Sequence, residues 1–333
     1  MSPTTSRPAC PSCCCSPASR RVTSAARPDV HGEVSISSAG YATTVTTHGA
    51  TERCLTAAGR DLIAPFPRGA RRPEMRGALL APWPGRTSGA RYTYDGTEHV
   101  LPTNEPGRNA ALHGFAAWTE FDIVTHEPDR VVMAGEILPG RGYPWRLDLV
   151  VDVAVDNAGL THVITATNVG TGTAPVGLGF HPYLLAGEMR AGAADAWTMS
   201  LQAGHVLALT GRALDPGPLA PFEPAAVRDD RGGQSLEGVR LNHAYTTLER
   251  DDDGWSRVRL TGDGGAGVEL AVDRGYPWIH VYTADEAPAP DRRASVAVEP
   301  TTCPPDAFNS GRDLVRLGRG ESLSAACRVR ALS

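Results

Sequence analysis

Short apolar segments that alternate with clusters of turn residues run through most of this chain. Residues 147–155 carry apolar side chains at near period-two spacing, and Asp156-Asn157-Ala158-Gly159 separates them from a second such segment at 160–168. This spacing is typical of strands with one buried face. Apolar residues at helical spacing never persist long enough to predict a helix of ordinary length. The sequence therefore predicts an all-β fold, and its 36 Gly and 27 Pro supply the turns that many strands need.

Five further segments have the same character and are bounded by turn residues. They are residues 121–124, 131–137, 257–260, 268–272 and 278–283. No change of composition marks an internal boundary after residue 34. We therefore expect a single large domain over residues 34–333, built as a sandwich or barrel of strands.

Residues 1–33 are rich in Ser, Pro, Thr, Arg and Ala and contain few large apolar side chains. Such a segment cannot bury enough surface to offset the entropy of ordering it, so we expect a disordered, low-complexity tail. Cys10, Cys13, Cys14 and Cys15 lie within it. A zinc knuckle needs four ligands in a tetrahedron, and no second Cys-x-x-C pair follows at that spacing, so we favour an unstructured segment over a metal site.

Charge and hydropathy exclude several classes of protein. The net charge of −5 gives no reason to expect a nucleic-acid partner. The sequence contains no Lys, which excludes a Schiff-base or P-loop lysine. No stretch approaches the roughly 18 apolar residues of a membrane span, and the N-terminal residues lack the apolar core of a secretory signal. We expect a cytoplasmic protein with no membrane partner.

Three strings contain groups that can move protons. Leu112-His113-Gly114 follows a polar loop, and Gly179-Phe180-His181-Pro182-Tyr183 holds a second histidine, where Pro182 favours extended backbone at His181. Glu299 ends an apolar strand, a natural place for a general base that faces a concave cleft. Each group also has a purely structural explanation: a histidine in a turn or in the core, and an exposed glutamate at a strand end.

Other residues suit a sugar ligand. The aromatic residues beside His181 suit the C–H faces of a sugar ring. Arg86 follows the Pro-rich turn Ala81-Pro82-Trp83-Pro84-Gly85, from which a guanidinium can reach hydroxyl groups, and Asn242 precedes a predicted strand. A dinucleotide-binding glycine motif, a serine nucleophile elbow and a zincin helix are all absent from the sequence. The remaining His, Glu, Arg and Asn residues favour proton transfer over covalent catalysis.

Taken together, these strings resemble the aldose 1-epimerase (galactose mutarotase) family. The resemblance extends from about residue 49 to residue 329, and the matching pieces follow the order of the family. They are Gly59-Arg60-Asp61-Leu62, Ala81-Pro82-Trp83-Pro84-Gly85-Arg86, Leu112-His113-Gly114-Phe115, Gly142-Tyr143-Pro144-Trp145, Thr167-Asn168, Gly179-Phe180-His181-Pro182-Tyr183, Leu241-Asn242-His243-Ala244-Tyr245, Glu299-Pro300-Thr301 and Phe308-Asn309-Ser310-Gly311. The resemblance implies a large antiparallel β-supersandwich.

The resemblance also implies a reaction that uses no cofactor and no metal. Glu299 is expected to be the general base that takes the proton of the anomeric hydroxyl, and His181 the general acid that protonates the ring oxygen. His113 is expected to stabilise developing charge at the ring oxygen. Arg86, Asn242 and Tyr183 are expected to bind the sugar. The expected substrates are free aldohexoses of the glucose and galactose type; the sequence leaves open whether the protein is a monomer or a homodimer.

Two positions depart from the family pattern. Many members have Asn where this chain has Gly85, and many have Asp where it has Asn242. The first change removes one contact to a sugar hydroxyl. The second keeps an acceptor but loses a charge, and a charged hydrogen bond contributes roughly 1.5–3 kcal/mol against about 1 kcal/mol for a neutral one. Neither change removes a proton-transfer group.

Three alternatives remain from the sequence. The first is a hexose-phosphate epimerase, whose anion site would be supplied by Arg68-Gly69-Ala70-Arg71-Arg72, although we favour a solvated loop as the explanation of that run. The second is a sugar-binding or sensor protein without catalytic activity on the same fold. The third is a metal-dependent β-barrel enzyme that uses His113, His181, His243 and Glu299 as ligands.

Overall fold

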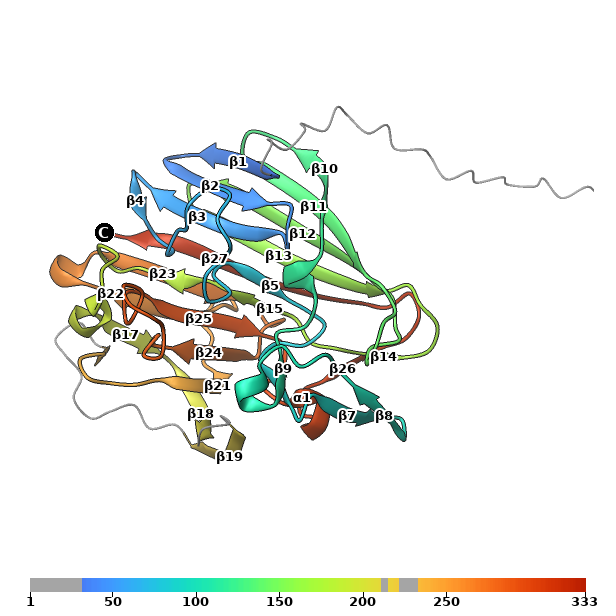
Figure 1. Cartoon of the computed structure of the whole chain (residues 1–333). Helices are drawn as coiled ribbons and strands as arrows, with labels where there is room; N and C mark the ends of the chain where they lie inside the picture. The colour runs from blue at the N-terminus through green and yellow to red at the C-terminus, as the bar shows by residue number, and fades with distance from the viewer. Residues whose placement is uncertain (1–31, 211–214, 222–232) are drawn as a thin grey trace, which may run out of the picture.

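The computed structural model describes residues 32–210, 215–221 and 233–333 (Figure 1). The predicted tail therefore lies outside the described residues, apart from its last two positions, and so do its four cysteines. Glu33, at the end of that predicted tail, begins the first strand. None of the helices in the described part of the chain is long and apolar enough to cross a membrane.

The largest sheet within the described residues has nine strands, and every pairing between its neighbours is antiparallel. In spatial order the strands are β10 (Asp122–His126), β11 (Arg130–Ile137), β12 (Leu147–Asp156), β13 (Gly159–Asn168), β27 (Ser322–Leu332), β23 (Gly267–Val272), β22 (Ser256–Thr261), β17 (Thr198–Leu201) and β20 (Gln234–Ser235). The strand that comes last in the sequence, β27, thus lies in the middle of the sheet, between β13 and β23.

The predicted alternation of apolar residues positions this sheet against the core. On β12 the side chains of Leu147, Leu149, Val151 and Val153 are fully buried, whereas Asp148 and Val150 between them are exposed. Strands predicted from the sequence at residues 131–137, 147–155, 160–168, 257–260 and 268–272 correspond to β11, β12, β13, β22 and β23. The all-β prediction is confirmed.

A second sheet of eight strands carries most of the candidate site residues. Its order is β19 (Asp215–Pro221), β18 (Ala203–Thr210), β21 (Asn242–Leu248), β24 (Trp278–Tyr282), β25 (Val296–Thr301), β15 (Gly179–His181) and β5 (Ala78–Leu80), and β16 (Tyr183–Leu184) also pairs with β25. All six residues of β25 are buried. This central strand therefore places its side chains in the interior on both faces of the sheet.

Smaller sheets complete the architecture (Figure 1). One has the order β1 (Glu33–Ser38), β2 (Tyr41–Thr46), β3 (Thr51–Ala57) and β4 (Arg60–Asp61); the two-stranded ones are β6 (Arg86–Ser88) with β9 (Ala110–Leu112), β7 (Arg91–Tyr94) with β8 (Thr97–Val100), and β14 (Ala174–Val176) with β26 (Val315–Leu317). The helical segments are short turns at η1 (Pro106–Arg108), η2 (Ala116–Trp118), η3 (Ala193–Ala196), η4 (Asp263–Gly265) and α1 (Ala307–Ser310).

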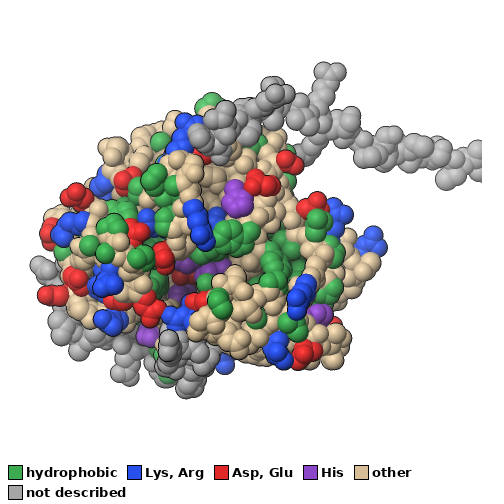
Figure 2. All heavy atoms as spheres, in the orientation of Figure 1, with side chains coloured by type: hydrophobic (Ala, Val, Ile, Leu, Met, Phe, Trp, Pro, Cys, Tyr) green, Lys and Arg blue, Asp and Glu red, His purple; other side chains and the backbone are tan. Residues whose placement is uncertain are grey.

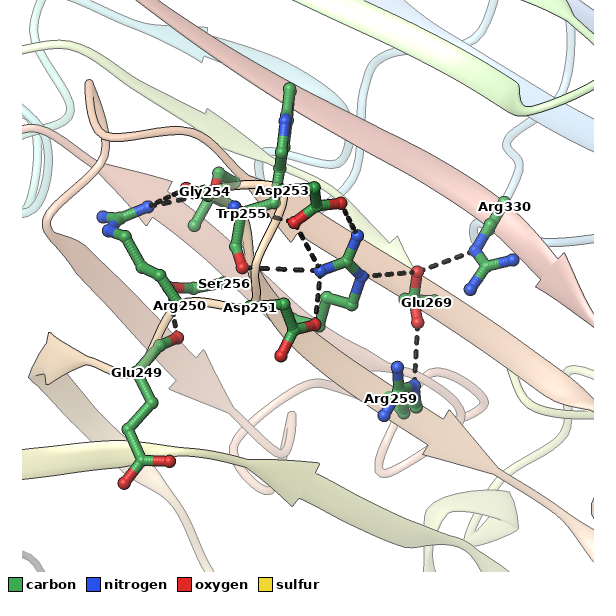
Figure 3. A network of polar contacts seen from close by, with 12 residues as sticks. Glu249, Arg250, Asp251, Asp253, Gly254, Trp255, Ser256, Arg259, Glu269 and Arg330 are labelled. Carbon is green, nitrogen blue, oxygen red and sulfur yellow. Dashed lines mark hydrogen bonds and ion pairs between the residues drawn. The ribbon is translucent and has the colours of Figure 1, made fainter.

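An ion-pair network ties β22, β23 and β27 together (Figure 3). Glu269 on β23 accepts hydrogen bonds from Nε of Arg259 on β22 and from Nε of Arg330 on β27, each at 2.7 Å. Burial by itself would raise the pKa of Glu269, but the arginine hydrogen bonds outweigh it and hold the pKa below its usual range. Because the carboxylate is shared by neighbouring strands, it favours their correct alignment.

The buried core also contains a carboxyl group without a charged partner among the described residues. Glu52 on β3 is 1 % exposed, and neither of its carboxylate oxygens has a hydrogen-bond partner among the described residues. Burial raises its pKa to about 8, against a smaller opposing effect of the nearby Thr43 hydroxyl. The glutamate is therefore predominantly protonated at neutral pH, since the low-dielectric interior disfavours the charged form.

Candidate active site

A cavity of about 500 Å³ opens over the face of the eight-stranded sheet on which Glu299 lies. Its walls come from segments far apart in the sequence: β25, β24, β21 and β15, the turn before β6, the residue after β9, η2 and the loop between β4 and β5. Figure 2 shows histidine side chains inside a hollow on the face in view. The cavity brings together all six residues that the sequence nominated, Arg86, His113, His181, Tyr183, Asn242 and Glu299.

Glu299 projects into this cavity from the centre of β25. It pairs with His280 of β24, so the two side chains share one face of the sheet. Glu299 is 4 % exposed, and burial raises its pKa to about 8 against an opposing effect of the Arg86 charge. The structural alternative for this residue, an exposed glutamate at a strand end, is therefore wrong, because Glu299 is the fourth of the six residues of β25 and is buried.

His181 ends β15 and lies opposite Ala78 of β5. The backbone is held on both sides of Pro182: Gly77 N donates to His181 O at 2.9 Å, and Val298 N donates to Pro182 O at 3.1 Å. His181 is 5 % exposed, and burial lowers its pKa to about 3, with the Arg72 and Arg86 charges acting in the same direction. Its imidazole is therefore fixed in position and disfavours a second proton.

The two side chains meet in the cavity. Nε2 of His181 lies 3.3 Å from Oε1 of Glu299. Burial raises the pKa of Glu299 and lowers that of His181, so the neutral form of each group is favoured. Over a wide pH range the pair therefore holds one exchangeable proton between them. A pair in this state offers one proton acceptor and one proton donor to a bound molecule.

His113 contributes a second ring to the same spot, since its centroid lies 5.1 Å from that of His181 at an edge-to-face angle. Gly85 N donates a hydrogen bond to Nδ1 of His113 at 3.1 Å, and His113 N donates to Gly85 O at 2.8 Å. A ring nitrogen that accepts from a backbone N–H carries no proton, so the proton of the neutral imidazole lies on Nε2. Burial, with the nearby His181 and Arg86, lowers the pKa of His113 well below its usual range. His113 is therefore a neutral hydrogen-bond donor.

The turn at His113 explains why glycine surrounds it. His113 has a φ of 62°, and a Cβ on the following Gly114 would lie 2.1 Å from Ala81 O. Gly85 has a φ of 68°, and a Cβ there would lie 3.1 Å from Pro305 Cα. Glycine at position 85, where many family members have Asn, thus allows Pro305 to pack against this turn.

Asn242 lies beside a histidine that the sequence analysis did not nominate. Nε2 of His280 lies 2.8 Å from Oδ1 of Asn242. His280 is buried, and burial lowers its pKa to about 3, aided by the Arg86 charge. The one signal in the sequence was a histidine within the apolar segment Trp278-Ile279-His280-Val281. The neutral imidazole therefore donates to an amide oxygen that faces the cavity.

Arg86 lies at the cavity wall but is held by a carboxylate. Its Nε and Nη2 donate to the two oxygens of Glu105 at 2.6 and 2.9 Å. Nε of Arg108 reaches the same carboxylate at 3.0 Å. The bidentate pair fixes the plane of the guanidinium, so any remaining donors point in a defined direction. Glu105 was not nominated because it lies in a loop, and its partnership depends on tertiary contact.

Tyr183 is buried and stacks on His181, with ring centroids 5.1 Å apart and 11° between the planes. The guanidinium of Arg76 lies over the Tyr183 ring, 5.8 Å from the ring centroid. Burial raises the pKa of the Tyr183 hydroxyl well above its usual range. Tyr183 therefore both lines the cavity and orients the imidazole of His181.

A metal centre fits these residues poorly. Ligand atoms of His113, His181 and Glu299 lie within 4.8 Å of one another. However, Nδ1 of His113 is occupied by Gly85 N–H and its Nε2 carries the proton, which leaves two groups where catalytic zinc uses three protein ligands. His243 is in register with Val281 and Val298, on the face of the sheet opposite to Glu299. The proposed four-residue ligand set is therefore not assembled.

Comparisons with known proteins agree with this geometry. The family model "Aldose 1-epimerase" matches residues 33–330. The uncharacterized protein YihR of Escherichia coli is 31 % identical over 294 residues, which cover 86 % of this chain and 89 % of YihR. Among solved structures, the GalM/aldose epimerase homologue from C. elegans superposes with a TM-score of 0.75 at 19 % identity, covering 90 % of this chain and 98 % of the other. A galactose mutarotase-like protein from Clostridium acetobutylicum also gives 0.75, at 13 % identity, with 90 % and 94 % covered. These two show a shared fold.

Proposed function

The chain belongs to the aldose 1-epimerase family, and we propose that it interconverts the α and β anomers of aldohexoses by general acid–base catalysis. The observation that carries this proposal is the His181–Glu299 pair, a buried acid and base 3.3 Å apart on the wall of a cavity large enough for a hexose. Among the described residues, no other ion-pair contact on the cavity wall joins two side chains that are both buried. Such a pair is suited to move protons at two neighbouring oxygens of one ligand.

The reaction opens the ring with a pair of proton transfers. The raised pKa of Glu299 and the lowered pKa of His181 place the shared proton on Glu299 in the resting pair. Once this proton has passed to Nε2 of His181, the carboxylate of Glu299 accepts the proton of the anomeric hydroxyl. The C1–O5 bond breaks as C1 becomes an aldehyde, and Nε2 of His181 donates its proton to O5. The pair then holds the same number of protons as before, with one moved from imidazole to carboxyl group.

Closure runs the same steps in reverse on the other face of the aldehyde. Rotation about C1–C2 turns the carbonyl through half a turn. His181 now takes the proton from the O5 hydroxyl as O5 attacks C1, and Glu299 returns its proton to the carbonyl oxygen. The sugar has changed anomer, and the pair has returned to its starting state, as microscopic reversibility requires.

The other cavity residues position the sugar in this proposal. The Nε2–H of His113 supplies a neutral donor to the ring oxygen as charge develops there, which requires no reorganisation because Gly85 already fixes the imidazole. Asn242 and Arg86 bind sugar hydroxyls, each pre-oriented by its own partner, His280 and Glu105. Because the catalytic groups are kept in place, the sensor or sugar-binding alternative is less favoured than catalysis.

Polarimetry of freshly dissolved α-D-glucose and α-D-galactose tests the proposal directly. We expect the protein to accelerate the approach to the equilibrium rotation and Glu299→Gln to lose that acceleration. The matched control is Glu98→Gln, which changes an exposed glutamate that does not line the cavity. Equal acceleration by both variants would show that Glu299 is not the base.

A further inference from the structure

The cavity has an arginine that no carboxylate of the described residues pairs with. Four arginines line it, and two of them, Arg86 and Arg108, are paired with Glu105. Arg72 is half-buried, and no carboxylate oxygen of the described residues lies within ion-pairing distance of it. Burial lowers its pKa to about 10, which still leaves it charged at neutral pH. Charges held in such positions are ordinarily paired, because desolvation of an isolated ion is costly.

Neutral groups hold Arg72 in place. Its Nη1 donates to Oγ1 of Thr51 on β3 at 2.6 Å, and its Nη2 donates to Ala117 O in η2 at 2.7 Å. These bonds use two of the five N–H donors of a guanidinium. The side chain is therefore fixed in position and keeps both its full charge and further donors.

The anchor at Ala117 ties Arg72 to the segment that carries His113. The segment from His113 to Ala117 is pinned as a unit, since Phe115 N and Ala116 N both donate to Ala81 O, at 2.7 and 3.0 Å. The charge of Arg72 contributes to lowering the pKa of both His113 and His181. By contrast, the exposed Glu74 acts on the hydroxyls of Tyr183 and Tyr282 at another part of the wall.

An exposed aromatic ring completes this corner of the cavity. Trp118 is 50 % exposed and lines the cavity, and the Arg72 guanidinium lies 5.0 Å from its ring centroid. Arg71 also lines the cavity here and is exposed, with no carboxylate partner among the described residues. An indole face beside a guanidinium can pack on an apolar sugar face while the cation binds a substituent.

We propose that Arg72, with Arg71 at the rim, binds an anionic group on the substrate, so that the preferred substrate is an aldohexose that carries a carboxylate, phosphate or sulfonate on C6. This inference rests on the proposed interconversion of sugar anomers. C6 is bonded to C5, which also carries O5, so a group on C6 lies on the same side of the sugar as the oxygen that His181 protonates. Arg72 is hydrogen-bonded to the segment that begins at His113, and its charge acts on both His113 and His181, so we place it on that side of the sugar.

The test compares anomer exchange for neutral and anionic hexoses. The rate of exchange between the α and β anomers is measured at equilibrium from their anomeric proton signals in NMR spectra. The sugars are D-glucose, D-glucuronate, D-glucose 6-phosphate and 6-deoxy-6-sulfoglucose, which differ in the shape and charge of the group on C6. We expect kcat/KM for at least one anionic sugar to exceed that for glucose by about 10- to 100-fold, the range given by one charged hydrogen-bonded contact. Which anion is preferred identifies the chemistry of the group.

Variants assign the preference to Arg72. Arg72→Gln should reduce the ratio of anionic to neutral kcat/KM by about 10- to 100-fold, and Arg72→Lys should retain part of it, because the charge remains. Arg130→Gln, which breaks an exposed ion pair with Asp152 away from the cavity, is the matched control and should keep the ratio. If Arg72→Gln does not fold, the wild-type preference and its decrease with added salt decide the question instead.

The possible results separate the two proposals. Turnover of glucose with no preference for any of the three anionic sugars, or an equal loss for all sugars in Arg72→Gln, overturns the anion subsite alone. If no sugar is accelerated, calorimetric titration of the protein with the same sugars still tests the subsite. Tighter binding of an anionic sugar that Arg72→Gln loses would then support the subsite and overturn the interconversion of anomers; binding of none would overturn both.

Discussion

Nε2 of His181 lies 3.3 Å from Oε1 of Glu299, and both side chains are almost completely buried. The contact joins the end of β15 to the middle of β25. Because both groups disfavour charge in this environment, one proton is shared between them, and removing either group removes both the donor and the acceptor of the proposed reaction.

The first prediction concerns this pair as a unit. Glu299→Gln and His181→Asn should each lower kcat by about 100- to 10 000-fold, the range for general acid–base catalysis, while circular dichroism and thermal unfolding remain close to wild type. The double variant should be little worse than either single one, since the two groups act together. Multiplicative losses in the double variant would mean that the two residues act independently.

The second prediction is the pH dependence of the reaction. Burial raises the pKa of Glu299 to about 8 and lowers that of His181 to about 3, so the shared proton is present between these values and is lost as the pH rises through about 8. We expect kcat/KM, corrected for the spontaneous rate, to be level from pH 5.5 to 7.5 and to fall about tenfold per pH unit above 8. A change in kcat/KM centred near pH 6.5, the ordinary pKa of histidine, would contradict this account.

The third prediction tests the departure at Asn242. In Asn242→Asp the carboxylate replaces the amide oxygen that Nε2 of His280 contacts at 2.8 Å, and a sugar hydroxyl at this position would then donate to a charge. We expect KM for glucose and galactose to change by roughly 10-fold and their ratio to shift, with kcat nearly unchanged, because a charged hydrogen bond differs from a neutral one by about 1 kcal/mol or more. Unchanged KM for both sugars would show that this position does not bind substrate.

The fourth prediction concerns stability. The pKa of Glu52 is raised to about 8 from an ordinary 4.5, so the native state binds the extra proton and its stability falls as the pH rises from 4.5 towards 8. Glu52→Gln remains neutral at every pH. Its free energy of unfolding in urea, relative to wild type, should therefore increase by about 3 kcal/mol between pH 5 and pH 8. If the free energies of unfolding of the variant and the wild type changed in parallel with pH, the ionisation of Glu52 would have no effect on stability. Glu98→Gln serves as the exposed control.

Much of the fold was accessible from the sequence because it depends on local pattern. The alternation on β12 reflects a sheet with one buried face, so its apolar residues indicate the strand by themselves. Residues 121–124 and 278–283 were placed within two residues of β10 and β24. Strand partners were not accessible, since pairings such as β27 with β13 join segments more than 150 residues apart.

The residues of the candidate site also differ in how far the sequence alone identifies them. His113, His181 and Glu299 stand in distinctive short strings, and the structure brings them within reach of one another. His280 carries no such string, and its importance follows only from its register with Glu299. Arg72 lies in a run of arginines that the sequence alone would explain as a solvated loop. Only the tertiary contacts show that Arg86 has a carboxylate partner, whereas Arg72 is held by the backbone oxygen of Ala117.

The position of β27 has a consequence for how the protein is made. The strands β13 and β23 each precede it in the sequence, yet both pair with it and not with each other. Until β27 has been made and has taken its place, β13 and β23 each have one edge without the partner that the folded sheet gives them. Completion of the sheet therefore depends on contacts between segments far apart in the sequence, which are slow to form. Until then the nascent chain exposes edges that invite pairing with other chains, and a chaperone that shields them would increase the yield of folded protein.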